Sequence, residues 1–237
     1  MKKTFKVSKL IAEAGICSRR KAEILIKEGR VKLNNKILKS VPERATTKDI
    51  ISVDNKEINI KKKIRLWKYY KSTGLLTTNY DPLGRKTIFE VIPKTLPRIV
   101  TVGRLDLNSE GLLLLTNSGS FSRHLELPKN SFIREYKVKV RGKIDIEKLK
   151  NLKKGIIIKG IKYGAIEANI LKKSETNAWI KMRLIEGKNR EIRKIMNFFG
   201  WTVNKLKRIS YGPIKLKNLK KNEIKEININ KYFKKKL

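Results

Sequence analysis

Cysteine and histidine are nearly absent: the 237 residues contain one of each, Cys17 and His124. A single cysteine cannot form an intramolecular disulfide framework, which suits the reducing cytoplasm. One cysteine and one histidine also leave no Cys/His cluster for a zinc site. A lone histidine in an expected helix is more often structural than catalytic. Chemistry in this chain therefore has to depend on carboxylate, Tyr, Lys or Arg side chains.

Long apolar runs are missing as well. No segment approaches the roughly 20 residues that an apolar helix needs to span a bilayer. The basic N-terminal stretch is interrupted by Lys9 and Glu13, which does not fit a secretory signal peptide. Because 40% of the residues are hydrophobic, a core is possible, and the length suits one large or two modest domains. We expect a soluble cytoplasmic protein without a membrane partner.

Acidic residues are scarce: 21 of them oppose 59 lysines and arginines, a formal net charge of +38. The excess is spread along the chain, so a folded body repels itself unless a polyanion neutralises it. Nucleic acid is the leading partner because phosphate contacts supply sequence-independent affinity. Abundant Lys, Ile and Asn also indicate a compositional bias that raises the charge without changing its sign. An anionic membrane surface is a weaker alternative, since no expected helix is strongly amphipathic with a bulky apolar face.

Residues 5–62 are expected to form a small basic domain of two helices and a small sheet. Apolar residues at helical spacing predict a first helix within residues 6–15, and Ser18 is a suitable N-cap for a second helix that ends before Gly29. A hairpin is expected to turn at residues 34–35, where two asparagines follow each other. Short strands at residues 51–53 and 57–60 complete the predicted sheet.

Three stretches of this region resemble the S4-type RNA-binding domain: residues 9–15 (KLIAEAG), 18–22 (SRRKA) and 29–34 (GRVKLN). Such domains bind structured RNA through its shape and phosphates rather than by reading a long sequence. The same charges could belong to an ordinary solvated face, but the resemblance favours RNA contact. It implies that RNA is bound by Arg19, Arg20, Lys21 and Arg30.

Residues 63–237 are expected to form a second domain, entered through the charged junction at residues 61–63. Its strands are too numerous and too hairpin-like for a doubly wound sheet, so we predict a mixed, largely antiparallel sheet and an α+β chain overall. The lysine-rich tail from about residue 222 is expected to be partly frayed. We predict strands at residues 64–70, 75–78, 99–102, 112–115, 135–140, 155–158, 178–184, 203–208 and 214–216, and helices at 87–92, 121–127, 144–152 and 192–199.

The stretch at residues 103–117 (GRLDLNSEGLLLLTN) combines a polar, glycine-bounded loop with an unbroken apolar run. The run at residues 112–115 suits a fully buried strand, although periodicity by itself does not exclude a helix. Asp106 therefore lies on a loop anchored to the core, which is the support that a reactive group needs. For an isolated loop aspartate, capping a turn or pairing with Arg104 is the favoured interpretation, so the rest of the chain has to decide.

This stretch resembles the pseudouridine synthases of the small-subunit-A and large-subunit-B group, which carry G-R-L-D, a polar spacer and G-L-L-L-L-T-N. The family isomerises uridine within RNA to pseudouridine without a cofactor or a metal. The resemblance implies that Asp106 is the catalytic aspartate, that Tyr136 stacks on the target base and that Arg193 pairs with the aspartate. Further motifs occur in the family's order: Tyr-Tyr-Lys at residues 69–71, Gly-Arg at 84–85, Arg-Glu-Tyr at 134–136 and E-G-K-N-R-E-I-R at 186–193.

The residue chemistry agrees with this implication. A carboxylate can act as nucleophile at the sugar and hold a covalent intermediate while the uracil turns. A neighbouring arginine favours the ionised carboxylate, and an aromatic face holds the base outside its stack. One departure is Ser72, which stands where the family usually has proline and could loosen the turn after Lys71. Around this site we also predict RNA contacts by Lys71, Arg104, Lys188 and Arg190.

The residues 69–94 look most like the large-subunit-B type, which modifies 23S rRNA. We therefore expect a monomer that acts on 23S rRNA, with the type that modifies 16S rRNA as the runner-up. A noncatalytic RNA-binding or ribosome-assembly protein is an alternative from another class. It is disfavoured because a pure binder has no need of a loop carboxylate facing anionic RNA. A DNA-binding protein is also disfavoured, since no recognition helix or dimerising heptad is apparent.

Overall fold

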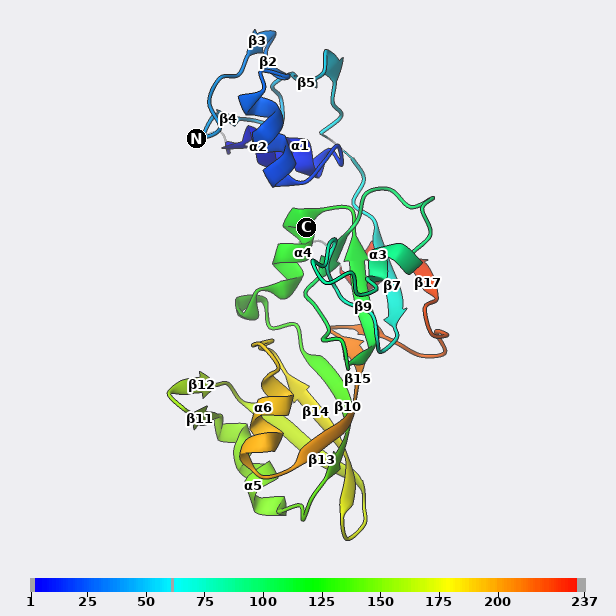
Figure 1. Cartoon of the computed structure of the whole chain (residues 1–237). Helices are drawn as coiled ribbons and strands as arrows, with labels where there is room; N and C mark the ends of the chain where they lie inside the picture. Colours follow the sequence, from blue (N-terminus) through cyan, green and yellow to red (C-terminus); the bar gives the residue numbers. More distant parts are fainter. Residues whose placement is uncertain (1–2, 61, 234–237) are drawn as a thin grey trace. The chain divides into compact units, whose positions relative to one another are not determined.

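The computed structural model describes residues 3–60 and 62–233 (Figure 1). Their contacts divide these residues into two compact units, one built from residues 3–60, 62–65, 94–100 and 116–121 and the other from residues 66–93, 101–115 and 122–233. Residue 61 of the expected junction and residues 234–237 of the expected frayed tail lie outside the described residues. Within the described ranges, none of the helices has the length and apolar character needed to cross a bilayer.

The first unit begins with two short helices, α1 (Val7–Glu13) and α2 (Arg19–Lys27). Helix α2 starts where the sequence predicts, because the Ser18 hydroxyl accepts a 3.1 Å hydrogen bond from the backbone N–H of Lys21. The hairpin also turns where expected, with Asn34 and Asn35 at φ values of 48° and 66°. A four-stranded sheet has the order β3 (Lys36–Ile37), β2 (Val31–Leu33), β5 (Ile51–Val53) and β6 (Lys56–Glu57), and β1 (Phe5–Lys6) pairs with β4 (Arg44–Ala45).

The second unit is organised around one large sheet that is antiparallel at most of its described pairings. The exception is β15, which runs parallel to β9 with Lys207 opposite Glu110. The predicted mixed, largely antiparallel sheet is therefore confirmed, and the chain is α+β. The strand order is β13 (Ile166–Lys173), β14 (Asn177–Leu184), β10 (Arg134–Arg141), β15 (Thr202–Tyr211), β9 (Glu110–Thr116), β7 (Leu66–Lys71) and β17 (Ile224–Ile227); β8 (Val100–Val102) pairs with β9, and β16 (Ile214–Lys215) with β15.

The remaining elements of this unit are short. Helix α6 packs against β15 and buries Ile192, Ile195 and Met196 at the helical spacing expected from the sequence. Strands β11 and β12 form a separate hairpin. The helices are α3 (Ile88–Val91), α4 (Gly119–Glu126), α5 (Ile146–Asn151), α6 (Glu191–Phe198) and α7 (Ile229–Tyr232), with 3-10 turns at Pro128–Asn130 and Leu152–Lys154; the hairpin strands are β11 (Ile156–Ile158) and β12 (Ile161–Tyr163).

Three sequence expectations need correction. The tail is not frayed over its described length, because β17 pairs antiparallel with β7 and completes an edge of the sheet. The expected strand at residues 75–78 is instead a loop with a single bridge from Leu76 to Thr87. Strand β13 was not predicted from the sequence, because it is an edge strand with a single buried residue, Ile166, and therefore lacks the alternation that marks a half-buried strand.

Close contact between β9 and β15 explains one glycine in the stretch at residues 103–117. Gly111 has a φ of +106°, and a Cβ there would lie 2.3 Å from the backbone oxygen of Arg208. Only glycine lets the two strands approach in this way. The four leucines that follow, Leu112 to Leu115, are fully buried, as their unbroken apolar run predicts. The loop before β9 is thus attached to the centre of the sheet.

Candidate active site

Asp106 lies on the loop between β8 and β9, in a turn closed by a 3.0 Å hydrogen bond from the Ser109 N–H to the Asp106 backbone oxygen. The Thr77 hydroxyl holds the preceding residue by donating to the Leu105 carbonyl at 2.9 Å. Among the described residues, the Asp106 carboxylate accepts no hydrogen bond, so it does not cap this turn. The backbone of the loop is held on both sides, and the carboxylate remains available to a ligand.

Lys71 supports the same loop from beneath. Its side chain is fully buried, and its ammonium donates to the backbone carbonyls of Asp106 at 3.0 Å, Ser109 at 2.8 Å and Ser72 at 3.0 Å. Burial lowers the pKa of Lys71 to about 8, against the smaller opposing effect of Asp106. The prediction that Lys71 contacts RNA is wrong in this structure, because no part of it reaches the surface. The ammonium also holds the carbonyl of Ser72, which restrains the turn where the family has proline.

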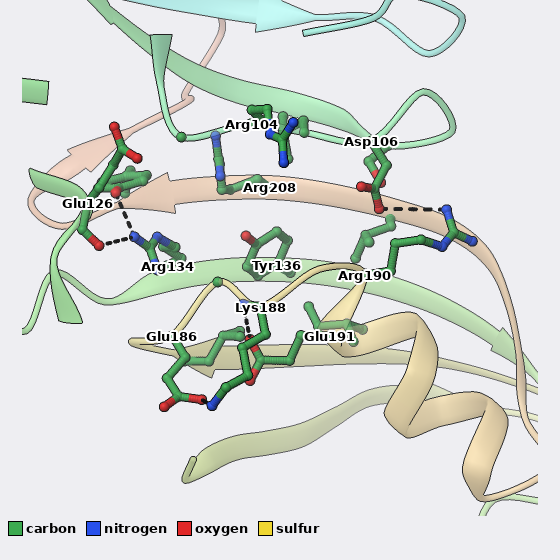
Figure 2. A pocket seen from close by; sticks show the side chains of 18 of the residues that line it. Arg104, Asp106, Glu126, Arg134, Tyr136, Glu186, Lys188, Arg190, Glu191 and Arg208 are labelled. Atoms are coloured by element: carbon green, nitrogen blue, oxygen red, sulfur yellow. Dashed lines mark hydrogen bonds and ion pairs between the residues drawn. The ribbon is translucent and has the colours of Figure 1, made fainter. Parts of the chain in front are cut away.

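Two arginines near Asp106 have different roles. Arg190 lies 3.9 Å from the carboxylate, measured from Nη1 to Oδ2, and forms the ion pair drawn in Figure 2. Arg193 instead donates to the backbone carbonyls of Asn108 at 2.8 Å and Val203 at 3.0 Å. The expected pairing of Arg193 with Asp106 is therefore replaced here by Arg190. Arg193 connects α6 and β15 to the loop that carries Asp106.

Tyr136 and Asp106 line the same cavity, of about 340 Å³. Figure 2 shows the phenol of Tyr136 on β10, between the loop of Asp106 and the start of α6. The Tyr136 side chain is 8% exposed, so the ring is packed into the sheet and faces the cavity with little freedom. A second cavity, of about 720 Å³, adjoins the first and is also lined by Asp106, together with Thr78 and Asn189. Asp106 thus lies at the boundary between the two cavities.

The structure places three of the eight predicted RNA-contacting residues around these cavities. Arg104, Lys188 and Arg190 are exposed and line both of them. The Lys188 ammonium is engaged with Glu186 and donates to the Lys162 carbonyl at 2.8 Å. Arg104 and Arg190 are therefore better placed than Lys188 to meet an incoming phosphate.

The predicted contacts on α2 belong to the first unit. Arg19, Arg20 and Lys21 are exposed along the start of this helix. Arg30 is exposed too, but its guanidinium makes two hydrogen bonds to Asp54, at 2.7 and 2.8 Å, and a third to Glu28. Much of the Arg30 charge is compensated within the protein, so the contacts on α2 are the stronger candidates for binding phosphate.

Sequence reasoning missed the buried cations beneath the cavity. Arg134, quoted only as part of a motif, is 6% exposed and donates to the Tyr211 hydroxyl at 2.8 Å and to the Glu126 carbonyl at 3.1 Å. A Cβ at Gly187 would lie 3.0 Å from Arg134 Nη1, which explains the glycine in E-G-K-N-R. Arg208 is 2% exposed and also lines the cavity. Nothing in the local sequence around Arg208 distinguishes it from neighbouring surface lysines.

The start of α6 contributes a buried carboxylate. Glu191 is 4% exposed, and its Oε2 accepts a 3.0 Å hydrogen bond from the Lys188 N–H. Burial raises the pKa of Glu191. Among the residues that the structure describes, no group of three or more His, Cys, Asp and Glu side chains is arranged to hold a metal ion. The arrangement of the cavity suits a polar, planar ligand held between an aromatic ring and a carboxylate.

Comparison with known proteins gives consistent results across both parts of the chain. The profile of the RNA pseudouridylate synthase family matches residues 65–198, and that of the S4 domain matches residues 6–51. An uncharacterized RNA pseudouridine synthase of Rickettsia felis is 49% identical, over 94% of this chain and 96% of its own length. The ribosomal large subunit pseudouridine synthase B of Bacillus subtilis is 36% identical, over 94% of this chain and 91% of its own.

A solved structure of a pseudouridylate synthase has the same fold, with a TM-score of 0.68 at 23% identity over 96% of this chain and 98% of its own. The first family match includes Asp106, Tyr136 and Arg193, and the second includes helix α2. On the strength of these matches, the chain belongs to the RNA pseudouridylate synthase family and carries an S4 domain at its N-terminal end.

Proposed function

We propose that this RNA pseudouridine synthase acts in the cytoplasm on 23S rRNA, with Asp106 as its nucleophile. The observation that carries the role of Asp106 is its carboxylate, which accepts no hydrogen bond among the described residues and shares a cavity with Tyr136 on a loop held by Lys71 and Thr77. Support for the substrate comes from the relatives in Bacillus subtilis and Yersinia pestis, both named ribosomal large subunit pseudouridine synthase B.

The chemistry assigned to Asp106 needs no co-reactant. Its carboxylate attacks C1′ of the uridine, the C1′–N1 bond breaks, and the bonding pair leaves with the uracil. The detached base turns against the Tyr136 ring until its C5 faces C1′. C5 then forms the new bond to C1′ and displaces the carboxylate; afterwards C5 loses a proton and N1 gains one. The sum is an isomerisation.

The two cavities suit this sequence of steps. The smaller one, lined by Tyr136, takes the flipped uracil, and the adjoining one takes the flanking nucleotides. Arg104 and Arg190 lie where these cavities meet and bind the phosphates on either side of the target. Arg193 acts as a positioning residue, because it bonds to the backbone of the Asp106 loop.

Substitution of Asp106→Asn tests the proposal for the nucleophile. The variant keeps the shape of the side chain but lacks a nucleophilic oxygen, so release of tritium from 5-tritiated uridine in rRNA should stop while RNA binding persists. Glu175→Gln, which removes an exposed carboxylate outside the cavities, serves as the control for charge and should release tritium like the unaltered protein. Substantial turnover by Asp106→Asn would exclude the nucleophilic role, and a lack of turnover by the unaltered protein would favour a noncatalytic assembly factor.

The substrate is tested separately by mapping pseudouridines in rRNA from cells with and without this protein. We expect one position of 23S rRNA to lose its pseudouridine and to regain it when the unaltered chain, but not Asp106→Asn, is restored. Loss at a position of 16S rRNA would favour the small-subunit type instead.

A further inference from the structure

We propose that Arg208 is a further catalytic residue, whose guanidinium stabilises the negative charge of the uracil after its bond to the sugar breaks. This inference rests on the proposed role of Asp106 and assigns a role to a buried arginine that the preceding mechanism does not use.

The position of Arg208 brings it to the target base. On the paired strands β10 and β15, Arg208 lies opposite Tyr136 in register, so the two side chains are neighbours on one face of the sheet. Both line the cavity that holds Asp106. Figure 2 shows Arg208 on β15, between strand β10 and the loop that carries Arg104 and Asp106, with its guanidinium directed towards that loop. A uracil stacked on Tyr136 therefore meets Arg208 at its edge.

The surroundings of Arg208 leave its charge uncompensated. The side chain is 2% exposed; Nε donates to the Leu112 carbonyl at 2.7 Å, whereas Nη2 is buried without a hydrogen-bond partner among the described residues. Its guanidinium carbon lies 5.3 Å from the centre of the Tyr211 ring, and in the same described set no carboxylate forms an ion pair with it. A buried cation with an unused donor is costly unless a ligand supplies the acceptor.

Other buried atoms on the cavity wall point to the same kind of ligand. Ser109 Oγ and Glu191 Oε1 are also buried and lack partners in the described part of the chain. Together with Arg208 Nη2, they place a hydroxyl, an acceptor and a charged donor on residues that line one cavity. An apolar ligand would leave all three unsatisfied, whereas a pyrimidine carries carbonyl oxygens and an N–H along its edge.

A guanidinium at this position stabilises the transition state of bond breaking more than it stabilises the bound uridine. When the Asp106 oxygen bonds to C1′ and the C1′–N1 bond breaks, the electron pair passes to the uracil and spreads over its nitrogens and carbonyl oxygens. Nη2–H then donates to an anionic oxygen instead of a neutral one, so a bond with one charged partner becomes a bond between opposite charges, which is stronger in a buried site. Arg208 keeps its proton throughout. The negative charge leaves the uracil when C5 bonds to C1′ and returns to the displaced Asp106 carboxylate. Because the interaction strengthens as the bond breaks, it accelerates that step.

The leaving-group dependence of Arg208→Gln tests this role. In single-turnover reactions on rRNA containing uridine, we expect the variant to lose about 100-fold or more in rate, with an RNA Kd close to that of the unaltered protein. On the same RNA containing 5-fluorouridine, fluorine already stabilises the uracil anion, so the loss should be at least about tenfold smaller. Arg208→Lys, which keeps a cation but loses the planar donor, should fall between the two proteins and show the same dependence on fluorine; it also provides the test if Arg208→Gln does not fold.

Three outcomes would overturn the inference. An equal loss of single-turnover rate on both substrates indicates a structural role for Arg208, and a weakened RNA Kd with an unchanged rate indicates a phosphate contact. Unchanged rates on both substrates show that Arg208 has no role in the reaction. Asp106→Asn is measured in parallel. If it turns over either substrate, the proposed nucleophile fails; if it is inert while Arg208→Gln behaves like the unaltered protein, only the role of Arg208 fails.

Discussion

The ammonium of Lys71 lies 3.0 Å from the backbone oxygen of Asp106, so the proposed nucleophile is held through its main chain rather than through its carboxylate. The same ammonium reaches the Ser109 carbonyl at 2.8 Å, at the other end of the turn. A buried lysine thus fixes the loop without occupying the carboxylate of Asp106.

Lys71→Met should lower kcat about tenfold or more, because a displaced carboxylate is poorly aligned with C1′. Loss of a donor to three carbonyls should also lower the free energy of unfolding by about 1–3 kcal/mol. Lys68→Met, on the same strand but partly exposed, is the control and should leave kcat near its normal value. A stable, fully active Lys71→Met protein would show that the clamp is dispensable.

The buried Lys71 also predicts a dependence of stability on pH. Its folded-state pKa of about 8 is below the value of 10.5 for a free lysine, so the unfolded chain binds more protons between these values. The penalty for burying the charge is fully present below about pH 8 and disappears as the pH rises towards 10.5. The stability of the unaltered protein relative to Lys71→Met should therefore increase between pH 7 and pH 10. Denaturant unfolding of both proteins at several pH values measures this difference, and a constant difference would contradict it.

Gly111→Ala should destabilise the protein severely. The new Cβ would meet the Arg208 backbone oxygen at 2.3 Å, so β9 and β15 would have to separate. Gly160→Ala is a matched control, because Gly160 also has a positive φ, of +75°, but has open space around its Cβ position. Its cost should be only about 1–2 kcal/mol. Similar thermal unfolding of the two variants would mean that the strand contact is easily relaxed.

Arg190 and Arg193 should give different kinetic defects. Arg193→Gln removes the bond to the Asn108 carbonyl and should lower kcat with little change in RNA Kd. Arg190→Gln removes an exposed charge and should weaken RNA binding. The slope of log K against log salt concentration should become shallower by about 1, as expected for one lost phosphate contact. Titration of RNA binding and single-turnover rates separate the two effects. A weakened RNA Kd for Arg193→Gln together with a lowered kcat for Arg190→Gln would contradict this division of roles.

The basic start of α2 should contribute to the salt dependence of RNA binding. Replacement of Arg19, Arg20 and Lys21 by Gln should weaken the affinity for rRNA and lower its salt slope by about 0.7–0.9 per lost phosphate contact. Arg30→Gln is the comparison, since Arg30 is already paired with Asp54 and should change the slope less. A larger effect from Arg30→Gln would show that its pair with Asp54 opens when RNA binds.

Local patterns were sufficient for much of the fold. The Ser18 cap, the Asn34–Asn35 turn and the four buried leucines of β9 were all predicted correctly, because each depends on neighbours within a few residues. The two edge strands of the large sheet, β13 and β17, were not predicted. Strand β13 has only one buried residue, and β17 lies in a lysine-rich tail, so neither has an apolar pattern. Both are stabilised by backbone pairing with a neighbouring strand of the sheet.

The sequence by itself determined the family, the α+β class and Asp106 and Tyr136 as the candidate residues, because these follow from motifs that are contiguous in the chain. Only the tertiary structure decided that Lys71 is a buried clamp, that Arg190 rather than Arg193 lies at the carboxylate, and that Arg208 lies beside Tyr136. Those relationships depend on strand order and register, which bring distant residues together. The local sequence does not distinguish a lysine or arginine on the surface from one buried beneath a cavity. Their chemical properties differ because the fold surrounds them with different groups.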